Sequence, residues 1–396
     1  MNRQNGAERP YHIVLFGATG FVGTLTAEYL ALTAPASCRW AIAGRDRARL
    51  EKLRARLAGI APRCADLSLL VADSTDPASL RSLAESTQVL ATTVGPYVWH
   101  GEGLVAACAE AGTDYADISG ETEFVDRMYV AYEDRARQTG ARLVHACGFD
   151  CVPHDLGAYF TVNQLPADVP LRIDGFVRTN AFFSGGTLAT ALNALSRGRQ
   201  SMEAAKLRRL HEPRLVGRRA VGPLGTPHFS KETGLWALPL PTLDARVVAR
   251  SAAALPRYGP DFRYRHFVGV KTLPVALGGT VAAGTGAALA RIPAVRRALM
   301  NRFEPGTGPD EARRSGSWFT ARFVGEGGGR RVFTEVSGGD PGYDETAKML
   351  AEVALSLAFD DLPKTSGQVT TAAAMGDALL ERLRSAGMVF RVAHSR

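Results

Sequence analysis

Three glycines near the amino terminus carry the most definite chemical signal in this chain. Gly17, Gly20 and Gly23 lie three residues apart in the segment Tyr-His-Ile-Val-Leu-Phe-Gly-Ala-Thr-Gly-Phe-Val-Gly, at residues 11–23. In a dinucleotide-binding turn, the first glycine permits the tight bend, the second lets a pyrophosphate approach the backbone, and the third lets the helix pack against the strand. The spacing therefore predicts a turn that holds the diphosphate of a dinucleotide.

The residues on both sides of these glycines supply the elements that such a turn requires. His12–Phe16 has the composition of a buried strand, and Phe21–Leu32 has apolar residues at helical spacing. The first N–H groups of that helix lack internal partners and its dipole is positive at this end, so it stabilises an anion. Thr19 adds a hydroxyl donor. The predicted phosphate-binding residues are Gly17, Thr19, Gly20, Phe21, Val22 and Gly23. A glycine-rich turn without a cofactor is the alternative.

Arg45 distinguishes between the two nicotinamide dinucleotides. The second predicted strand is followed by Gly44 and Arg45, whereas NAD enzymes commonly place an acidic residue here to bind the ribose 2′-hydroxyl. The always-charged guanidinium of Arg45 suits a 2′-phosphate instead. Asp46 is an acid nearby, and we interpret it as the N-cap of the next helix. The glycine spacing is also met in NADP-using Rossmann enzymes, so we predict NADP(H) as the cofactor.

Residues at the ends of the third and fourth predicted strands complete the cofactor site. Asp73 is placed to hydrogen-bond the adenine, and Thr93, Gly95 and Pro96 are placed to border the nicotinamide ribose. This follows because ligands of such a fold lie outside the carboxyl ends of the strands. Ordinary turn chemistry is the alternative, above all for Pro96.

Strand and helix patterns alternate through residues 1–150, which predicts a Rossmann-type α/β domain with a doubly wound parallel sheet. The predicted strands are His12–Phe16, Arg39–Ala43, Leu67–Ala72, Val89–Val94, Tyr115–Ile118 and Arg142–Ala146. The predicted helices between them are Phe21–Leu32, Asp46–Leu57, Pro77–Glu85, Gly103–Ala111 and Glu121–Thr139. Asp76, just before Pro77, is the predicted N-cap of the third helix.

The pattern changes after Gly148, and residues 151–340 predict an α+β domain with an antiparallel sheet for substrate binding or dimerisation. Its predicted elements are a strand at Arg172–Thr179, a helix within Gly186–Leu210, strands at Leu235–Ala253 and Tyr264–Val270, and a hairpin of Phe319–Gly325 with Arg331–Ser337. In residues 341–396 we predict helices Tyr343–Leu357 and Ala372–Leu383 and a strand Met388–Ala393, packed back on the first domain.

Composition limits the partners. The chain has 396 residues and a formal net charge of +8, which suits an anionic partner such as a phosphorylated cofactor, an anionic membrane surface or an acidic carrier protein. We expect no nucleic acid partner, and a homodimer is an open alternative. The first nine residues are polar and the cysteines number five, so we expect no signal peptide, no disulfide framework and a cytoplasmic protein.

The segment 273–290 is uncharged and is followed by basic residues as far as Arg302. It is short for a membrane span and contains Pro274 and several glycines. We favour a buried or interface helix. Peripheral contact of residues 273–302 with the inner face of the membrane, and a true span, are the alternatives.

Four potential metal ligands, His145, Cys147, Cys151 and His154, lie within ten residues. The spacing Cys-x3-Cys-x2-His across a strand end is not that of a standard zinc site. We therefore predict no metal in this segment.

Several motifs together resemble the saccharopine dehydrogenase-like oxidoreductases. They are Gly-Ala-Thr-Gly-Phe-Val-Gly (17–23), Thr-Thr-Val-Gly-Pro-Tyr (92–97), Asp-Tyr-Ala-Asp-Ile-Ser-Gly-Glu (114–121) and Ala-Cys-Gly-Phe-Asp-Cys-Val-Pro-His-Asp (146–155). Blocks at 236–253, 258–262, 342–358 and 371–383 extend the resemblance over nearly the whole chain, and the last ones are most similar to the actinobacterial trans-acting enoyl reductases. Members usually carry serine at the positions of Cys151 and His154, and His100 also departs from the family pattern.

The resemblance implies an NADPH-dependent reductase of a carrier-bound α,β-unsaturated acyl chain in polyketide or lipid synthesis. One alternative is a saccharopine-type amino-acid dehydrogenase, in which Arg178, Arg246 and Arg250 would grip substrate carboxylates. An apolar tunnel around Phe182, Phe183 and residues 273–290 would suit a lipid better. The other alternative is a non-catalytic nucleotide-binding protein associated with membrane or lipid.

Enoyl reduction needs a proton donor and a group that polarises the thioester carbonyl. The candidate catalytic residues are Tyr97, His100 and Glu121, at the carboxyl ends of the fourth and fifth predicted strands. Tyr97 is the first choice, because its side chain can donate a proton from its neutral form. Asp150 and Asp155 are further acid candidates. The alternative for Glu121 and Asp155 is helix capping.

Overall fold

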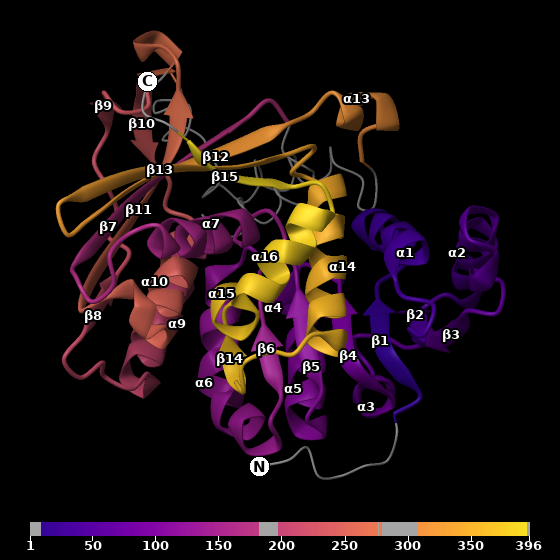
Figure 1. Ribbon diagram of the computed structural model, residues 1–396. Helices are drawn as coiled ribbons and strands as arrows, with labels where there is room; N and C mark the ends of the chain where they lie inside the picture. Colours follow the sequence, from indigo (N-terminus) through magenta and orange to yellow (C-terminus); the bar gives the residue numbers. More distant parts are fainter. Residues whose placement is uncertain (1–8, 182–196, 276, 279–307, 394–396) are drawn as a thin grey trace.

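The computed structural model describes residues 9–181, 197–275, 277–278 and 308–393, and these form two sheets with helices between and around them (Figure 1). The first sheet has seven strands in the order β14-β6-β5-β4-β1-β2-β3. All its described pairings are parallel. Its strands are β1 Tyr11–Phe16, β2 Trp40–Gly44, β3 Ser68–Val71, β4 Thr87–Thr92, β5 Asp114–Asp117, β6 Arg142–Val144 and β14 Gly367–Val369. The predicted Rossmann-type parallel sheet is confirmed.

Both faces of this sheet are covered, which explains its nearly continuous apolar strands. In β1, Ile13 and Leu15 pack with one core cluster, and Val14 and Phe16 pack with the other. Helices α1 Phe21–Thr33, α2 Arg47–Ile60 and α14 Asp344–Phe359 contribute to the first cluster. Helices α3 Pro77–Ser86, α5 Glu102–Ala111 and α6 Thr122–Thr139 contribute to the second.

Local signals set the ends of several of these helices. The side chains of Asp46 and Asp76 accept hydrogen bonds from the amides of Arg49 and Ala78, so the two aspartates cap α2 and α3 as predicted. Gly112 and Gly140 follow α5 and α6 in the left-handed conformation, with φ of 68° and 82°. The order of the strands reverses at β1, which lies between β4 and β2. A ligand is therefore expected to bind beside the carboxyl end of β1.

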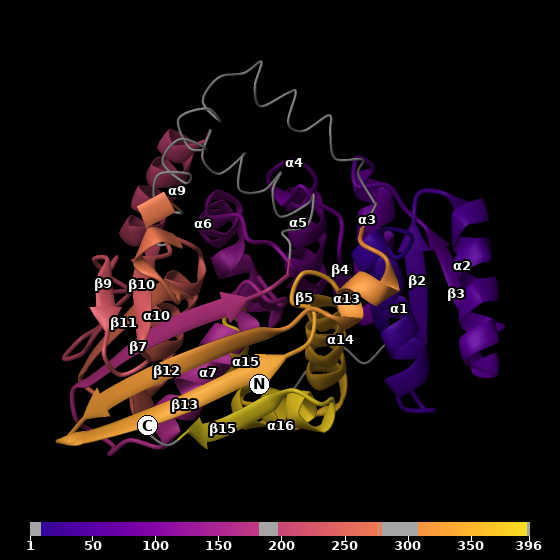
Figure 2. The same cartoon turned by 90° about the horizontal axis from the view of Figure 1, so that it is seen from above.

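The second sheet has eight strands in the order β15-β13-β12-β7-β11-β10-β9, with β8 paired to β11. Its strands are β7 Leu171–Thr179, β8 Arg219–Val221, β9 His228–Ser230, β10 Leu235–Pro239, β11 Asp261–Val270, β12 Phe319–Gly327, β13 Arg330–Gly338 and β15 Val389–Ala393. Seen from above, β7, β12 and β13 run side by side as long ribbons with β15 at the edge (Figure 2). The sheet is mixed and not wholly antiparallel as predicted, because β11 pairs with β7 and β8 in parallel.

One predicted strand is wrong. The segment predicted as a strand over Leu235–Ala253 forms the short strand β10, which ends at Pro239, and then the helix α10 Asp244–Ala254. Alanines favour the helix, and Val247, Val248, Ser251 and Ala252 make a buried face at helical spacing.

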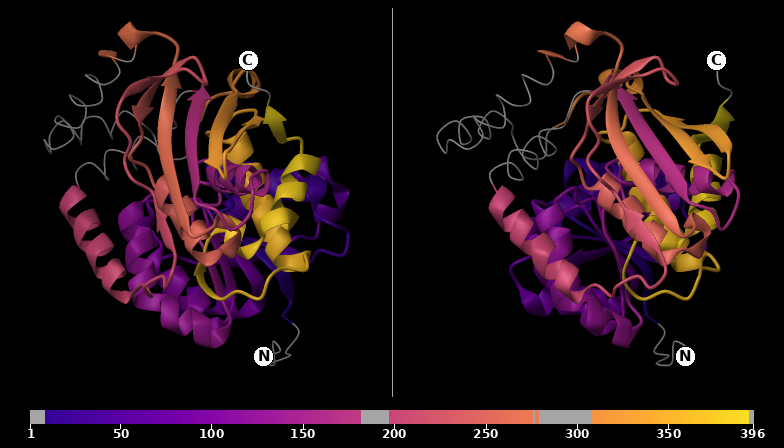
Figure 3. Two further views of the ribbon diagram at one scale, coloured as in Figure 1. Left: turned by 60° about the vertical axis from the view of Figure 1, so that its left-hand side comes forward. Right: turned by 90° about the vertical axis from the view of Figure 1, so that its left-hand side faces the viewer.

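Helices join the two sheets. Helix α7 Val152–Asn163 packs against β7, β12 and β13, and it lies between the sheets (Figure 1). A Cβ at Gly157 would lie 2.4 Å from the ring of Phe323, so this glycine allows α7 to approach the second sheet. Helix α9 Gly198–His211 packs along α6 (Figure 3).

The carboxyl-terminal segment contributes to both halves. Helix α14 packs on α1, β1, β4 and β5, strand β14 extends the first sheet beside β6, and β15 extends the second sheet beside β13. The predicted helix Ala372–Leu383 is divided into α15 Thr371–Ala374 and α16 Gly376–Ser385. The domain limits at residues 150 and 340 stay predictions.

In the part of the chain that the structure describes, no helix combines the length and the apolar character needed to cross a bilayer. Most of the segment 273–302, residues 182–183 and the start of the predicted helix Gly186–Leu210 lie outside the described residues.

Candidate active site

The glycine turn after β1 has the geometry that the sequence predicted. Gly17 has a φ of 84°, and a Cβ there would lie 2.7 Å from Val94 Cγ2. A Cβ at Gly23 would lie 2.2 Å from the carbonyl oxygen of Gly17, closer than any real contact. A Cβ at Gly20 would meet only that same oxygen, at 3.3 Å. The first and third glycines are therefore required by the protein, whereas the second is less closely surrounded.

The start of α1 fits an anionic group. Its N-cap residue is Gly20, which has no side chain to cap the helix, and the first turn holds no acidic residue. Helices α2 and α3, in contrast, have aspartate caps. The free amides and the positive end of the α1 dipole are thus left for a ligand, and a diphosphate suits them. Thr19 lies beside the end of β2, since a Cβ at Gly44 would be 3.8 Å from its hydroxyl.

The ring of Phe21 is held by the second half of the molecule. It packs edge-on against Tyr343, with 4.9 Å between ring centroids, and the Arg314 guanidinium lies 5.5 Å from its centroid. Arg314 is itself bonded to Asp344 at 2.9 Å. Figure 2 shows helix α13 Glu311–Ser315 beside α1. The backbone amide of Phe21 stays at the turn, while its side chain ties the turn to residues far along the sequence.

Arg45, Asp73 and His100 lie near one another on the other side of the glycine turn. Arg45 follows β2 and is exposed, as the binding of a ribose phosphate requires. Asp73 accepts two hydrogen bonds from Thr75, both 2.8 Å, and these bonds together with the charges of Arg45 and His100 lower the pKa of its carboxyl. His100 therefore lies near the end of β3, where the adenine is expected.

The predicted residues after β4 hold the glycine turn in place. Thr93 Oγ1 donates to the carbonyl of Gly17 at 3.1 Å, and the amide of Thr93 donates to Phe16 at 3.1 Å. The peptide bond between Gly95 and Pro96 is cis. These contacts fix the carboxyl end of β4 against the end of β1.

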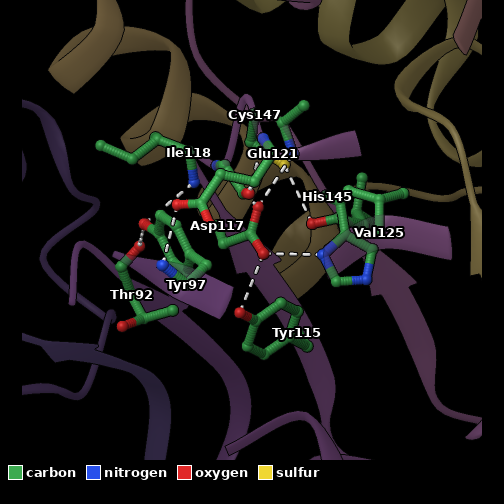
Figure 4. Close-up of polar contacts among 12 residues, drawn as sticks. Thr92, Tyr97, Tyr115, Asp117, Ile118, Glu121, Val125, His145 and Cys147 are labelled. Carbon is green, nitrogen blue, oxygen red and sulfur yellow. Dashed lines mark hydrogen bonds and ion pairs between the residues drawn. The ribbon is translucent and has the colours of Figure 1, made fainter. Parts of the chain in front are cut away.

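Tyr97 and Glu121 are engaged by the backbone (Figure 4). The Tyr97 hydroxyl donates to the carbonyl of Thr92 at 3.0 Å and accepts from the amide of Ile118 at 3.3 Å. The two carboxylate oxygens of Glu121 accept from the amides of Tyr97 and Val98, each at 2.9 Å. Glu121 thus caps α4 Tyr97–His100, and not the helix that follows it. Burial raises the pKa of both side chains.

Asp117 is the centre of a network that sequence reasoning missed. It lies at the end of β5 and is fully buried. Its Oδ2 accepts from the Tyr115 hydroxyl at 2.9 Å and lies 2.7 Å from His145 Nδ1, and its Oδ1 accepts from the amides of Ser119 and Ala146 (Figure 4). Asp117 belongs to the 114–121 motif, but its partners lie in or just after two strands, β5 and β6. Nδ1 of His145 is thereby engaged by Asp117.

The two other acid candidates differ from each other. Asp155 is buried in α7, where it accepts from Ser251 at 2.5 Å, Thr371 at 2.7 Å and the amide of Ala372 at 2.8 Å, so it caps α15. Asp150 follows β6 and is exposed to solvent. Nevertheless, the protein around it removes much of its water and the charge of Asp244 lies nearby, and these raise the pKa of Asp150 to about 7.

Two of the arginines considered as carboxylate ligands are occupied. Arg246 and Arg250 bind the buried Asp126, with N–O distances of 3.0 and 2.6 Å, and Arg208 is a third partner at 3.4 Å. Arg178 lies over the Trp318 ring, 5.7 Å from its centroid. The residues that a saccharopine-type substrate would need are thus largely committed to holding α6, α9 and α10 together.

Taken together, a parallel sheet that reverses order at β1, an uncapped glycine turn and an arginine after β2 define a Rossmann oxidoreductase that binds a nicotinamide dinucleotide. Residues 13–144 match the family model of the saccharopine dehydrogenase NADP-binding domain, which agrees with Arg45 and makes NADP(H) the cofactor.

Full-length relatives specify the family. The chain is 39% identical over 412 residues to a protein of Mycobacterium tuberculosis strain H37Rv that is provisionally named a trans-acting enoyl reductase, covering 96% of this chain and 97% of that one. It is 36% identical over 414 residues to the trans-acting enoyl reductase of Mycobacterium bovis BCG, covering 97% and 98%. The chain therefore belongs to the trans-acting enoyl reductase family.

A solved structure shares the fold. The apo saccharopine dehydrogenase (L-Glu forming) of Saccharomyces cerevisiae superimposes with a TM-score of 0.57 and 13% identity, covering 97% of this chain and 100% of that one. The protein is thus an NADP-dependent oxidoreductase of saccharopine dehydrogenase-like architecture.

Proposed function

We propose that this protein reduces the carbon–carbon double bond of an α,β-unsaturated acyl thioester with NADPH. The observation that carries the proposal is the similarity to trans-acting enoyl reductases over nearly the whole chain, because it includes the second sheet as well as the nucleotide-binding domain. Bound NADPH supplies the hydride that reduces the β-carbon. The protein must then provide a proton for the α-carbon and a donor to the thioester carbonyl.

Asp150 has the properties of the proton donor. It lies just past the carboxyl end of β6, on the sheet edge where β4 and β5 also end. It is exposed, and with a pKa of about 7 a large share of it is protonated at neutral pH. Tyr97 and Glu121 have hydrogen-bonding groups already engaged by the backbone, and His100 lies toward Asp73. Their catalytic roles stay predictions, and the contacts favour positioning roles for Tyr97 and Glu121.

We further propose an acyl carrier protein or a polyketide synthase as the partner that presents the substrate. The net charge of +8 supports this, because carrier domains are acidic and opposite charge accelerates their association. Peripheral membrane contact through residues 273–302 and a homodimer stay predictions.

The saccharopine-type alternative is disfavoured by the occupied arginines. A substrate with several carboxylates needs free guanidinium groups, whereas Arg246 and Arg250 are bound to Asp126. The non-catalytic alternative predicts NADPH binding without turnover.

One assay separates the three functions. NADPH oxidation is followed with crotonyl thioesters, with long-chain enoyl thioesters on a carrier protein, and with the substrates of saccharopine formation. The proposal predicts turnover of the enoyl thioesters alone. Turnover only with the amino-acid substrates would favour the second function. Tight NADPH binding by calorimetry, with no turnover of any substrate, would favour the third.

A further inference from the structure

Three potential metal ligands meet where the second sheet adjoins the helices. His154 lies in α7, Asp244 is the first residue of α10, and His266 lies in β11. One ligand atom of each lies within 4.8 Å of the other two. All three residues are buried, with 2–3% of their surface exposed. Helix α10 packs on both α7 and β11 (Figure 1), so the cluster links three segments that are distant in sequence.

The distances suit a shared ion better than a direct hydrogen bond. His154 Nε2 lies 3.4 Å from Asp244 Oδ1, longer than a normal N–H···O bond. Two ligands of a tetrahedral zinc ion, each at roughly 2.0–2.1 Å from the metal, lie about 3.3 Å apart. The rings of His154 and His266 are 4.5 Å apart between centroids, so the third potential ligand lies beside the other two.

Polar atoms in this cluster lack partners. Among the described residues, Asp244 Oδ1 and His266 Nε2 are buried without a hydrogen bond. Buried polar atoms are nearly always satisfied, by protein, water or an ion. An ionised Asp244 would also need a cation, and within the described residues its contact of this kind is with His154, which is charged only when protonated. The network around Asp117, by contrast, provides a partner for each carboxylate oxygen.

One neighbour favours the ligand form of His266. Tyr264 Oη lies 2.9 Å from His266 Nδ1. If Nδ1 carries the proton and donates to Tyr264, Nε2 is left with its lone pair for a metal.

We propose that His154, Asp244 and His266 bind a divalent transition cation of the zinc class. The ion joins α7, α10 and β11, with water in the remaining coordination position. This site shares only His154 with the contiguous set of cysteines and histidines that the sequence excluded, because Asp244 and His266 are brought to it by the fold.

The test begins with the full chain as purified. Mass spectrometry of its metal content is expected to show about one equivalent of zinc per chain. Removal by a chelator is expected to lower the melting temperature, and Co²⁺ added to the stripped protein is expected to give the visible absorption bands of a tetrahedral site.

Variants localise the ion. His266→Gln is expected to abolish the cobalt bands, and Tyr264→Phe, which keeps all three ligands, is expected to weaken binding roughly 10–100-fold. His228→Gln, outside the cluster, is the matched control and should bind as the unmodified protein does. If the folded protein contains no metal and gives no cobalt spectrum, or if His266→Gln retains both, the proposal is wrong. A buried water then satisfies these atoms.

Discussion

Two buried polar regions differ in how completely their carboxylates are paired. In the region of Asp117 and Glu121, the carboxylate oxygens accept hydrogen bonds from the protein itself. In the region of His154, Asp244 and His266, Asp244 Oδ1 is buried without a hydrogen bond. A paired network costs little and fixes geometry, whereas unpaired buried atoms are expensive unless a ligand occupies them. The first region is therefore held by the protein alone, and the second is the region where we propose a metal ion.

The largest effect is expected from a substitution in the glycine turn that forces β1 and α1 apart. In Gly23→Val, the added Cβ would lie 2.2 Å from the Gly17 carbonyl oxygen, so β1 and α1 would have to separate. We expect NADPH binding, measured by calorimetry, to be lost. Gly59→Ala is the control, because a Cβ there meets nothing within 4 Å, and it should bind normally. Retention of NADPH affinity by Gly23→Val would show that the turn does not hold the diphosphate.

The second largest effect tests Asp150, which borders the unpaired region. Asp150→Asn removes the proposed acid, and kcat is expected to fall roughly 10²–10⁴-fold. In the metal-free enzyme, where the charge of Asp244 is not compensated, kcat should decrease as the pH rises through about 7, because the carboxyl with its raised pKa loses its proton there. As the pH rises from about 4 to about 7, the same shift lowers the stability of the folded protein. The reason is that the folded state binds this proton more tightly than the unfolded state does.

The control for Asp150 is the pH profile of the variant. The decrease in kcat near pH 7 should be absent from the pH profile of Asp150→Asn, and so should the loss of stability over this range. If the variant keeps both its activity and that decrease, another group donates the proton.

The paired region is tested by Asp117→Asn. An amide NH₂ would face a backbone amide, or it would replace the oxygen that binds Tyr115 and His145. We expect a loss of about 2–4 kcal/mol in the free energy of unfolding, measured in urea. Asp134→Asn, at an exposed position, should change it by less than about 0.5 kcal/mol. Equal stability of the two variants would contradict the interpretation of Asp117 as part of a rigid frame.

The contrast between the two regions also shows what the sequence could predict. The glycine turn, the caps Asp46 and Asp76 and the strand–helix alternation are local, and they were predicted correctly because each signal lies within a few residues. The cluster of His154, Asp244 and His266 is not visible in the sequence, since its members are brought together only when α10 and β11 pack on α7.

The predictions that differ from the structure failed because they depend on tertiary packing. The valines of α10 suggested a strand, but the neighbours that bury one helical face decide the outcome. Arg246 and Arg250 were predicted as possible substrate ligands, but in the fold both are paired with Asp126 of α6. The tyrosine at 97 lies at the predicted strand end, yet its hydroxyl is used by Thr92 and Ile118. Position along a strand is thus predictable, whereas the direction and the partners of a side chain depend on the tertiary fold.

A smaller effect is expected at the exposed edge of the crevice. Arg45→Ala removes a charged donor from the ribose 2′-phosphate, so the affinity for NADPH should fall about 10–100-fold while that for NADH changes little. Calorimetric titration with both dinucleotides measures the ratio. Arg47→Ala is the matched control, because Arg47 is paired with Glu51 at 3.1 Å, and its ratio should stay close to that of the unmodified protein. An unchanged ratio in Arg45→Ala would assign cofactor choice to another residue.

The smallest effect is expected from Tyr97→Phe, which decides whether the paired region also takes part in catalysis. The substitution removes two hydrogen bonds, to Thr92 and from Ile118, but leaves the ring packed at 5.7 Å from Phe124. If Tyr97 only positions the backbone, unfolding should cost about 1–2 kcal/mol less, and kcat should fall less than about tenfold with an unchanged pH profile. If Tyr97 is the acid, kcat should fall at least about 100-fold with little change in KM, because an interaction made only in the transition state is lost. Since the hydroxyl is buried and its pKa is raised far from the working range by desolvation, the first outcome is the one that the structure supports.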